Sequence, residues 1–319
     1  MLPEGFSTWG VQLIESDTCV RKTPMTAMPT HLWPARYRMI DGWRALAALT
    51  VVCHHLHFGI QYNVGHMGVM VFFVISGYCI AATSESCLRH GHGLTTYMRR
   101  RVRRIYPPYL FALLFFAATR LLKWTMGGGM QLSSSIIVWL QTLTLTQWLT
   151  LLWHPATYAS SNQTLCVAAF WSLNYEEQFY LVIGAIMVVS SRLGWPIMWG
   201  VLALMIPAFA WNLTHPSISY GFFLEYWVHF SLGALVFYRL CKMTNATASR
   251  TIDAGLSILV LGSGVAWALN KGPGFPLQRS VYAEWFICGA FALFLLVARS
   301  VDDFLVRTWL AQSWPNSAF

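Results

Sequence analysis

The stretch IDGWRALAALTVVCHHLHFGI, from Ile40 to Ile60, sets the framework for the rest of the chain. It is apolar enough to cross a membrane as a helix, yet it carries an arginine and, eleven residues later, a histidine. At 100° a residue, the path from Arg44 to His55 makes three turns plus about 20°, so both side chains share one stripe. Along the axis they are roughly 16 Å apart, half of a hydrocarbon core. The stretch therefore predicts one polar group near a membrane surface and another deep inside.

The other histidines of this stretch do not lie on the same helix face as His55, so they do not form a metal site with it. His54 lies about 100° round the helix and His57 about 200° round, so the three imidazoles do not share a face. Seven cysteines are scattered through the chain without a Cys-x-x-Cys pair. We therefore expect no metal centre and no permanently bound cofactor.

The composition is that of a membrane protein. Of the 319 residues, 56% are hydrophobic and 10% are charged, and the mean hydropathy is +0.50. Soluble domains carry about 25% charged residues. We therefore predict an all-α fold, a polytopic bundle of membrane helices that contacts lipids. The net charge of +9 raises the question of nucleic acid, but no soluble basic domain is long enough to read a groove, so we expect no nucleic-acid partner.

Eight apolar segments are long enough to cross a membrane, some of them only when interfacial residues are included. They cover about residues 43–60, 68–84, 105–122, 177–191, 196–213, 221–240, 252–269 and 281–298. The semi-apolar run SIIVWLQTLTLTQWLTLLW lies between the third and fourth segments. A ninth span there would scatter the basic residues over both sides, so we interpret this run as an outer-leaflet or re-entrant cap.

The positive charges predict the orientation and the limits of the membrane domain. Most of the 21 lysines and arginines fall in loops on the N-terminal side, which places the N-terminus in the cytoplasm; the cell (bacterial inner) membrane is the location implied by the family resemblance given below. Residues 1–38 are expected to form a cytoplasmic extension, residues 39–300 the membrane domain, and residues 301–319 a truncated C-terminal segment.

The loop YMRRRVRRIYPPY concentrates five arginines just before the third segment. Arg101 and Arg104 are three residues apart, so they can face one ligand, with Arg100 beside them. Planar guanidinium groups bind phosphates in a bidentate manner, which would suit a charged cytoplasmic donor such as coenzyme A. The alternative is an orientation signal that contacts lipid headgroups.

Candidate proton-transfer groups lie elsewhere. The imidazole of His55 can take a proton from a hydroxyl and return it to a leaving thiolate, although membrane histidines also serve as helix-to-helix hydrogen-bonding groups. WSLNYEEQFYLV adds Glu176 and Glu177, which point about 100° apart. One of them could meet Arg44, His55 or a sugar hydroxyl. The alternative is a polar interfacial cap at the start of the fourth segment.

The second segment, GVMVFFVISGYCI, carries one hydroxyl, that of Ser76. No acid or histidine lies at helical spacing to activate it, so we expect Ser76 to bond backbone or a neighbouring helix. Gly65, Gly68 and Gly77 predict close helix packing. His229 with Glu225 one turn earlier forms a second polar pair, which we interpret as structural or substrate-lining.

Four of these motifs, taken in order, resemble acyltransferase family 3, the polytopic membrane acyltransferases that modify cell-envelope polysaccharides. IDGWRALAALTVVCHH is similar to the first-helix motif of that family, GVMVFFVISGY to its second-helix motif, RRVRRIYPPY to its Arg-x-x-Arg loop, and WSLNYEEQFYL to its Trp-Ser-Leu...Glu-Glu-Gln-Phe-Tyr motif. The resemblance covers about residues 39–300.

The resemblance implies transfer of an acyl group, usually acetyl, from cytoplasmic acyl-CoA to a hydroxyl of a glycan or lipid-linked saccharide. It implies that His55 is catalytic and that Arg44, Arg101 and Arg104 are essential partners. Two features depart from the family pattern: Met70 replaces an acidic residue, and the late helices of a fold of about ten spans are missing. The alternatives are therefore an inactive, truncated member, or a transporter or flippase of a lipid-linked saccharide.

Overall fold

The computed structural model describes residue 37 and residues 39–56, 64–128, 136–153, 170–215, 221–270 and 280–305. This part of the chain forms ten α-helices and contains no strand, which confirms the predicted all-α class. The predicted extension over residues 1–38 lies almost wholly outside the described residues, as does most of the segment 301–319. The predicted domain boundaries therefore stay predictions.

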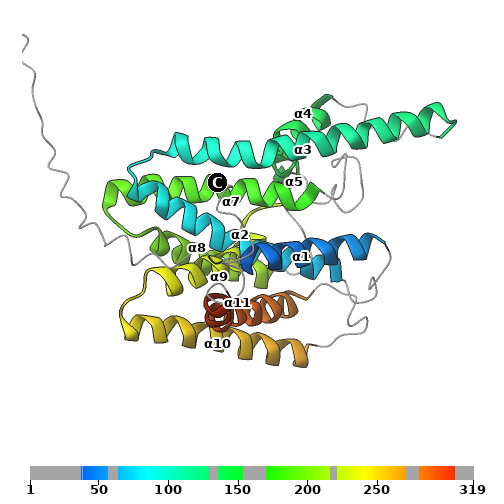
Figure 1. The fold of residues 1–319 in the computed structure, drawn as a ribbon. Coiled ribbons are helices and arrows are strands. Elements are labelled where there is room, and N and C mark those ends of the chain that lie inside the picture. Colours follow the sequence, from blue (N-terminus) through cyan, green and yellow to red (C-terminus); the bar gives the residue numbers. More distant parts are fainter. Residues whose placement is uncertain are drawn as a thin grey trace, which may run out of the picture. The chain divides into compact units, whose positions relative to one another are not determined.

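A helix lies in each of the eight predicted segments, of which residues 57–60 of the first are outside the described residues (Figure 1). Five of them are long and apolar enough to cross a membrane: α2 (Val64–Arg89), α3 (Leu94–Thr125), α8 (Ile197–Thr214), α10 (Ala246–Leu269) and α11 (Val281–Leu305), the last over Val281–Arg299. The other three are α1 (Met39–His55), α7 (Trp171–Leu193) and α9 (Leu224–Cys241). The 17 residues of α1 fall short of the roughly 20 needed to span, and both α7 and α9 contain ionisable residues.

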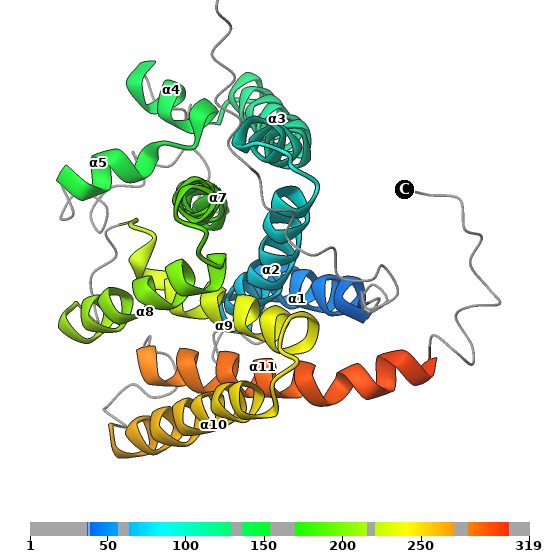
Figure 2. The ribbon, with the colours of Figure 1, turned by 90° about the vertical axis from the view of Figure 1, so that its left-hand side faces the viewer.

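Helix α9 forms the centre of the bundle. Every residue from Glu225 to Tyr238 is buried, so this helix has no face left for lipid. It packs against α2, α8 and α11, and Figure 2 shows it among them, with α3 and α10 at opposite edges. A helix enclosed on all sides can carry polar groups that would be costly on a lipid-facing helix.

Two glycines allow α2 and α9 to touch through their backbones. A Cβ at Gly77 would overlap the carbonyl of Phe230, and one at Gly233 would overlap the carbonyl of Val74. Gly68 lies against α1 in a similar way. The prediction that the glycines of the second segment permit close packing is confirmed.

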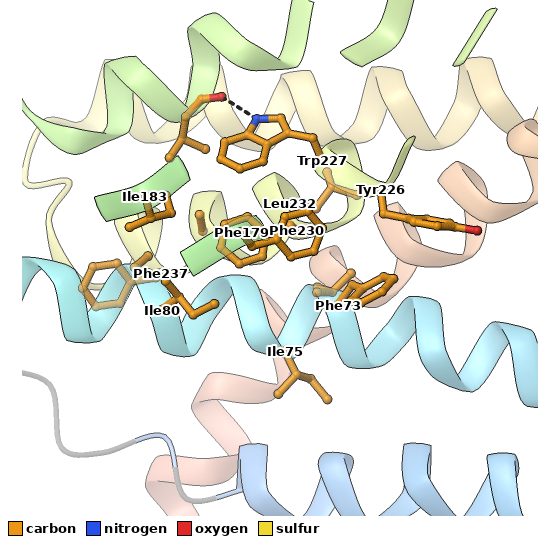
Figure 3. Packing of buried hydrophobic residues seen from close by; sticks show 14 of the residues in the cluster. Phe73, Ile75, Ile80, Phe179, Ile183, Tyr226, Trp227, Phe230, Leu232 and Phe237 are labelled. Carbon is orange, nitrogen blue, oxygen red and sulfur yellow. Dashed lines mark hydrogen bonds between the residues drawn. The ribbon is translucent and has the colours of Figure 1, made fainter. Parts of the chain in front are cut away.

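Aromatic side chains fill the space around this contact. The rings of Phe179 and Phe230 are stacked 4.6 Å apart, and Phe73 meets Phe179 edge-on at 5.5 Å. Figure 3 shows these side chains with Trp227, whose indole nitrogen donates a hydrogen bond of 3.1 Å to the carbonyl of Val201. That bond satisfies the one polar atom of a fully buried indole.

The run interpreted as a cap is broken into two short helices, α4 (Ile136–Thr144) and α5 (Gln147–Trp153). The break lies at Leu145, where φ is 54°. At 9 and 7 residues, neither helix can cross a bilayer, so the run is not a ninth span. The hydroxyl of Tyr109 on α3 donates to the carbonyl of Thr142, which fastens α4 to α3.

Candidate active site

Helix α1 carries both predicted residues of the stripe. It is continuous from Met39 to His55, and Arg44 near its start is half-buried. The Arg44 guanidinium lies 3.9 Å from Asp41 and 5.5 Å from the ring centre of Phe72 on α2. His55 is the last residue of α1 and its side chain is exposed.

The hydrogen bonding of His55 leaves one ring nitrogen able to act as a base. Its Nδ1 is 2.8 Å from the carbonyl oxygen of Val51. Because a carbonyl can only accept, Nδ1 carries the hydrogen, and in the neutral ring Nε2 keeps its lone pair. The adjacent His54 points elsewhere, since it packs against Gly65 at the start of α2.

Arg101 is the deeply buried member of the predicted arginine set. Only 4% of it is exposed, whereas Arg100 and Arg104 are exposed on the same helix. Its guanidinium lies 5.6 Å from the ring centre of Tyr97 and 5.2 Å from that of Tyr180 on α7. Its Nε and Nη2 are buried and have no hydrogen-bond partner in the described part of the chain. Because a buried charge is costly without a counter-charge, Arg101 is the first candidate to hold an anionic ligand.

A chain of contacts connects Arg101 to the other motifs. Tyr180, under the guanidinium, donates a hydrogen bond of 2.5 Å to Glu176, and Ser76 on α2 donates one of 2.8 Å to the same carboxylate oxygen. The prediction that Ser76 would bond a neighbouring helix is thus confirmed. The acid that it lacks on its own helix is supplied by α7.

The two adjacent glutamates of α7 have different surroundings. Glu176 is buried in the network with Ser76 and Tyr180, whereas Glu177 faces α3. One oxygen of Glu177 accepts a hydrogen bond of 3.0 Å from Tyr106. The other is buried without a hydrogen-bond partner among the residues described here, so it can accept from a ligand.

The structure brings the predicted arginines together and separates them from His55. Arg44 lies 5.5 Å from the ring centre of Phe72, and Arg100 donates a hydrogen bond of 3.8 Å to the thiol of Cys87, so α1 and α3 both present guanidinium groups to α2. We call this region, which borders α2 between Phe72 and Cys87, the arginine end. His55 is the last residue of α1, next to His54, which packs on Gly65 at the start of α2. His66 there contacts the first turns of α7, α9 and α11, and we call this region the histidine end.

The sequence did not reveal a cluster of two histidines and a glutamate at the histidine end. His66 on α2 has its Nε2 2.7 Å from one oxygen of Glu284 on α11, and His229 on α9 has its Nε2 3.5 Å from the other. Glu225, expected beside His229, accepts a 2.5 Å hydrogen bond from Tyr175. The available signal was Glu284 itself, a lone carboxylate in an apolar segment.

No cluster of three or more His, Cys, Asp or Glu side chains suited to a metal ion occurs within the described ranges. The candidate site consists of charged and hydroxyl groups in three places. Guanidinium groups lie against α2 at the arginine end, a carboxylate network links α2 to α7 in the interior, and imidazoles occupy the histidine end.

These features define a helical membrane protein whose interior holds a buried guanidinium joined to a carboxylate and hydroxyl network. The sequence matches the family described as "Acyltransferase domain" over residues 37–314. The chain belongs to this family, acyltransferase family 3, and the resemblance of its four motifs is confirmed.

Its relatives include named O-acetyltransferases. The chain is 30% identical over 162 residues to the peptidoglycan O-acetyltransferase OatA of Listeria monocytogenes, covering 48% of this chain and 24% of that protein. A Bacillus subtilis protein provisionally named a peptidoglycan O-acetyltransferase is 30% identical over 47% of this chain and 24% of its own length. A Staphylococcus aureus protein provisionally named an O-acetyltransferase is 29% identical over 57% of this chain and 31% of its own length. The matches thus span about a quarter to a third of these relatives, and no solved structure matches the chain.

Proposed function

We propose that this protein is a membrane-bound O-acyltransferase that moves an acyl group, acetyl in the first instance, from acyl-CoA to a hydroxyl of an envelope glycan. The acceptor is peptidoglycan or a lipid-linked saccharide. Family membership and the names of the relatives support this proposal. The observation that carries it is the buried, partly unbonded guanidinium of Arg101, linked through Tyr180 to Glu176 and Ser76.

The arginine end suits the donor. Acyl-CoA carries several phosphates, and guanidinium groups make charge-assisted hydrogen bonds to phosphate oxygens. Arg101 offers two nitrogen atoms without partners in the described part of the chain, and the exposed Arg100 and Arg104 add positive charge on the same helix. The predicted orientation places this end in the cytoplasm, where the donor is found.

The reaction requires two proton movements. The attacking hydroxyl loses a proton, the carbon–sulfur bond of the thioester breaks, and the leaving thiolate gains a proton. His55 is our first candidate for this work, because its Nε2 has a lone pair and its side chain is exposed. Glu177 is the carboxylate candidate with an oxygen to offer, whereas Glu176 already receives two hydrogen bonds.

The test measures transfer of label from acetyl-CoA to peptidoglycan fragments in membranes that contain the full chain. The informative pair of variants is His55→Gln and His90→Gln. His90 is a matched control, because it is also exposed and its Nδ1 is also 2.8 Å from the carbonyl four residues earlier, that of Ser86. We expect His55→Gln to lower transfer at least about 100-fold and His90→Gln to leave it unchanged.

Two results would count against the proposal. Full transfer by His55→Gln would remove His55 from the mechanism. Absence of transfer by the unaltered protein, together with movement of a lipid-linked saccharide across vesicles without acyl-CoA, would replace the enzyme by a transporter.

A further inference from the structure

The pair of His66 and Glu284 is a buried ionisable group that the proposed function has not used. Glu284 lies in the first turn of α11 and is 0% exposed, and His66 lies in the first turn of α2. Their helices are far apart in the sequence, yet Nε2 and Oε1 are 2.7 Å apart. Ionisable side chains inside a membrane protein are costly and are usually retained for function.

The geometry of the pair is that of a base held by a carboxylate. Because a carboxylate accepts, Nε2 of His66 carries the hydrogen, and in the neutral ring Nδ1 keeps a lone pair. A carboxylate that fixes the tautomer and direction of an imidazole is the recurring arrangement around general bases. The ring is also held from the side, since it stacks on Trp171 at 6.0 Å with 17° between the planes.

His66 differs from the neighbouring ionisable residues in its solvent exposure. Its side chain is 16% exposed, whereas those of Glu284 and His229 are 0% exposed. A ligand can therefore reach the imidazole of His66 but not the groups behind it. Trp171 and Tyr226 flank this imidazole, and Trp171 belongs to the same motif as Glu176. Aromatic faces beside hydrogen-bonding groups are suitable surroundings for a sugar ring.

We propose that His66, positioned by Glu284, is a further catalytic residue that removes the proton from the acceptor hydroxyl. This proposal rests on the proposed acyl transfer. The hydroxyl proton passes to Nδ1 of His66, the oxygen forms a bond to the thioester carbonyl carbon, and the carbon–sulfur bond breaks. The thiolate sulfur takes a proton from Nε2 of His55, which enters this step as the imidazolium and leaves it as the neutral ring with Nδ1 still bonded to the carbonyl of Val51. Water then removes the proton from His66 and restores that of His55, since both side chains are accessible.

The experiment uses the full chain in membranes, labelled acetyl-CoA and peptidoglycan fragments. The variants are His66→Gln, His66→Ala and Glu284→Gln, with His90→Gln as the control. We expect both His66 variants to lose transfer about 100-fold or more, while the KM for acetyl-CoA stays unchanged. Added imidazole should restore transfer to His66→Ala in proportion to its concentration, which a structural role would not produce. Glu284→Gln should lower kcat without raising that KM.

Each other outcome overturns a defined statement. If the unaltered protein transfers no label, the proposed function fails whatever the variants do. If it transfers label and His66→Gln retains half of that rate, the assignment of His66 is wrong. Loss of transfer without rescue by imidazole, or failure of both His66 variants to purify as monodisperse protein, makes His66 a structural residue and overturns the assignment.

Discussion

Replacing Arg101 with methionine removes a guanidinium that is 4% exposed and whose Nε and Nη2 have no hydrogen-bond partner in the described part of the chain. Methionine keeps an unbranched side chain that can pack on the rings of Tyr97 and Tyr180. The loss of cation–π attraction costs about 0.5–2 kcal/mol. Relief of the buried charge offsets this, because even whole buried ion pairs can be replaced by apolar residues with a neutral effect or a gain of about 1–4 kcal/mol, and a charge buried without a counter-charge costs more. We expect Arg101→Met to be as stable as the unaltered protein or more so.

The same substitution should weaken donor binding. A hydrogen bond to a charged group contributes about 1.5–3 kcal/mol, and 1.4 kcal/mol is tenfold in affinity. Loss of a single bond from Arg101 to a donor phosphate therefore raises the Kd for acetyl-CoA roughly 10- to 150-fold. Stability and binding should thus move in opposite directions, or binding should fall alone.

The assay compares purified Arg101→Met and Arg103→Met with the unaltered protein in detergent. Arg103 belongs to the same arginine run but is exposed, so it is the matched control. Thermal unfolding is followed by tryptophan fluorescence, and acetyl-CoA binding by equilibrium titration. A variant of Arg101 that unfolds at lower temperature and binds acetyl-CoA with unchanged affinity would refute the reasoning, because Arg101 would then be a structural cation.

Three further predictions concern the two glutamates of α7 and the packing of α2. Glu176→Gln should lower the free energy of unfolding by about 1–3 kcal/mol, because two hydroxyls donate to that carboxylate, as thermal unfolding can show. Glu177→Gln should unfold normally and lose acetyl transfer roughly 100-fold; equal effects of the two variants would contradict their different surroundings. Gly77→Ala should destabilise the protein by about 1–3 kcal/mol or more, since a Cβ there meets backbone of α9, whereas Gly255→Ala on α10, with open space at its Cβ, should not.

The sequence predicted the helices well because each apolar segment reports its own length and composition. It also predicted that Arg44 and His55 lie on one helix, but not that His55 is the exposed last residue of α1. It could not show that Arg101 is buried while Arg104 is exposed. A run of arginines on α3 has no apolar pattern that indicates which side faces α7. The sequence therefore could not predict which arginine points into the bundle.

Contacts between helices were hidden for a different reason. Ser76 and Glu176 are 100 residues apart, and His66 and Glu284 are 218 residues apart. Helical spacing reveals only neighbours on one helix, so it suggested His229 with Glu225 and found no acid for Ser76. The pairings that the structure shows depend on which helices pack together, and α2 takes part in both because it packs against α7 and α11.

The backbone contact between α2 and α9 also limits how the protein can move. At Gly77 and Gly233 each helix presents a carbonyl to the space that a Cβ would fill on the other, so neither can slide along its partner without a collision. The two helices should therefore move as one rigid unit, which keeps His66, Ser76 and His229 at fixed distances from one another. Any movement during turnover should therefore involve helices outside this pair, such as α3, which lies at the edge of the bundle in Figure 2.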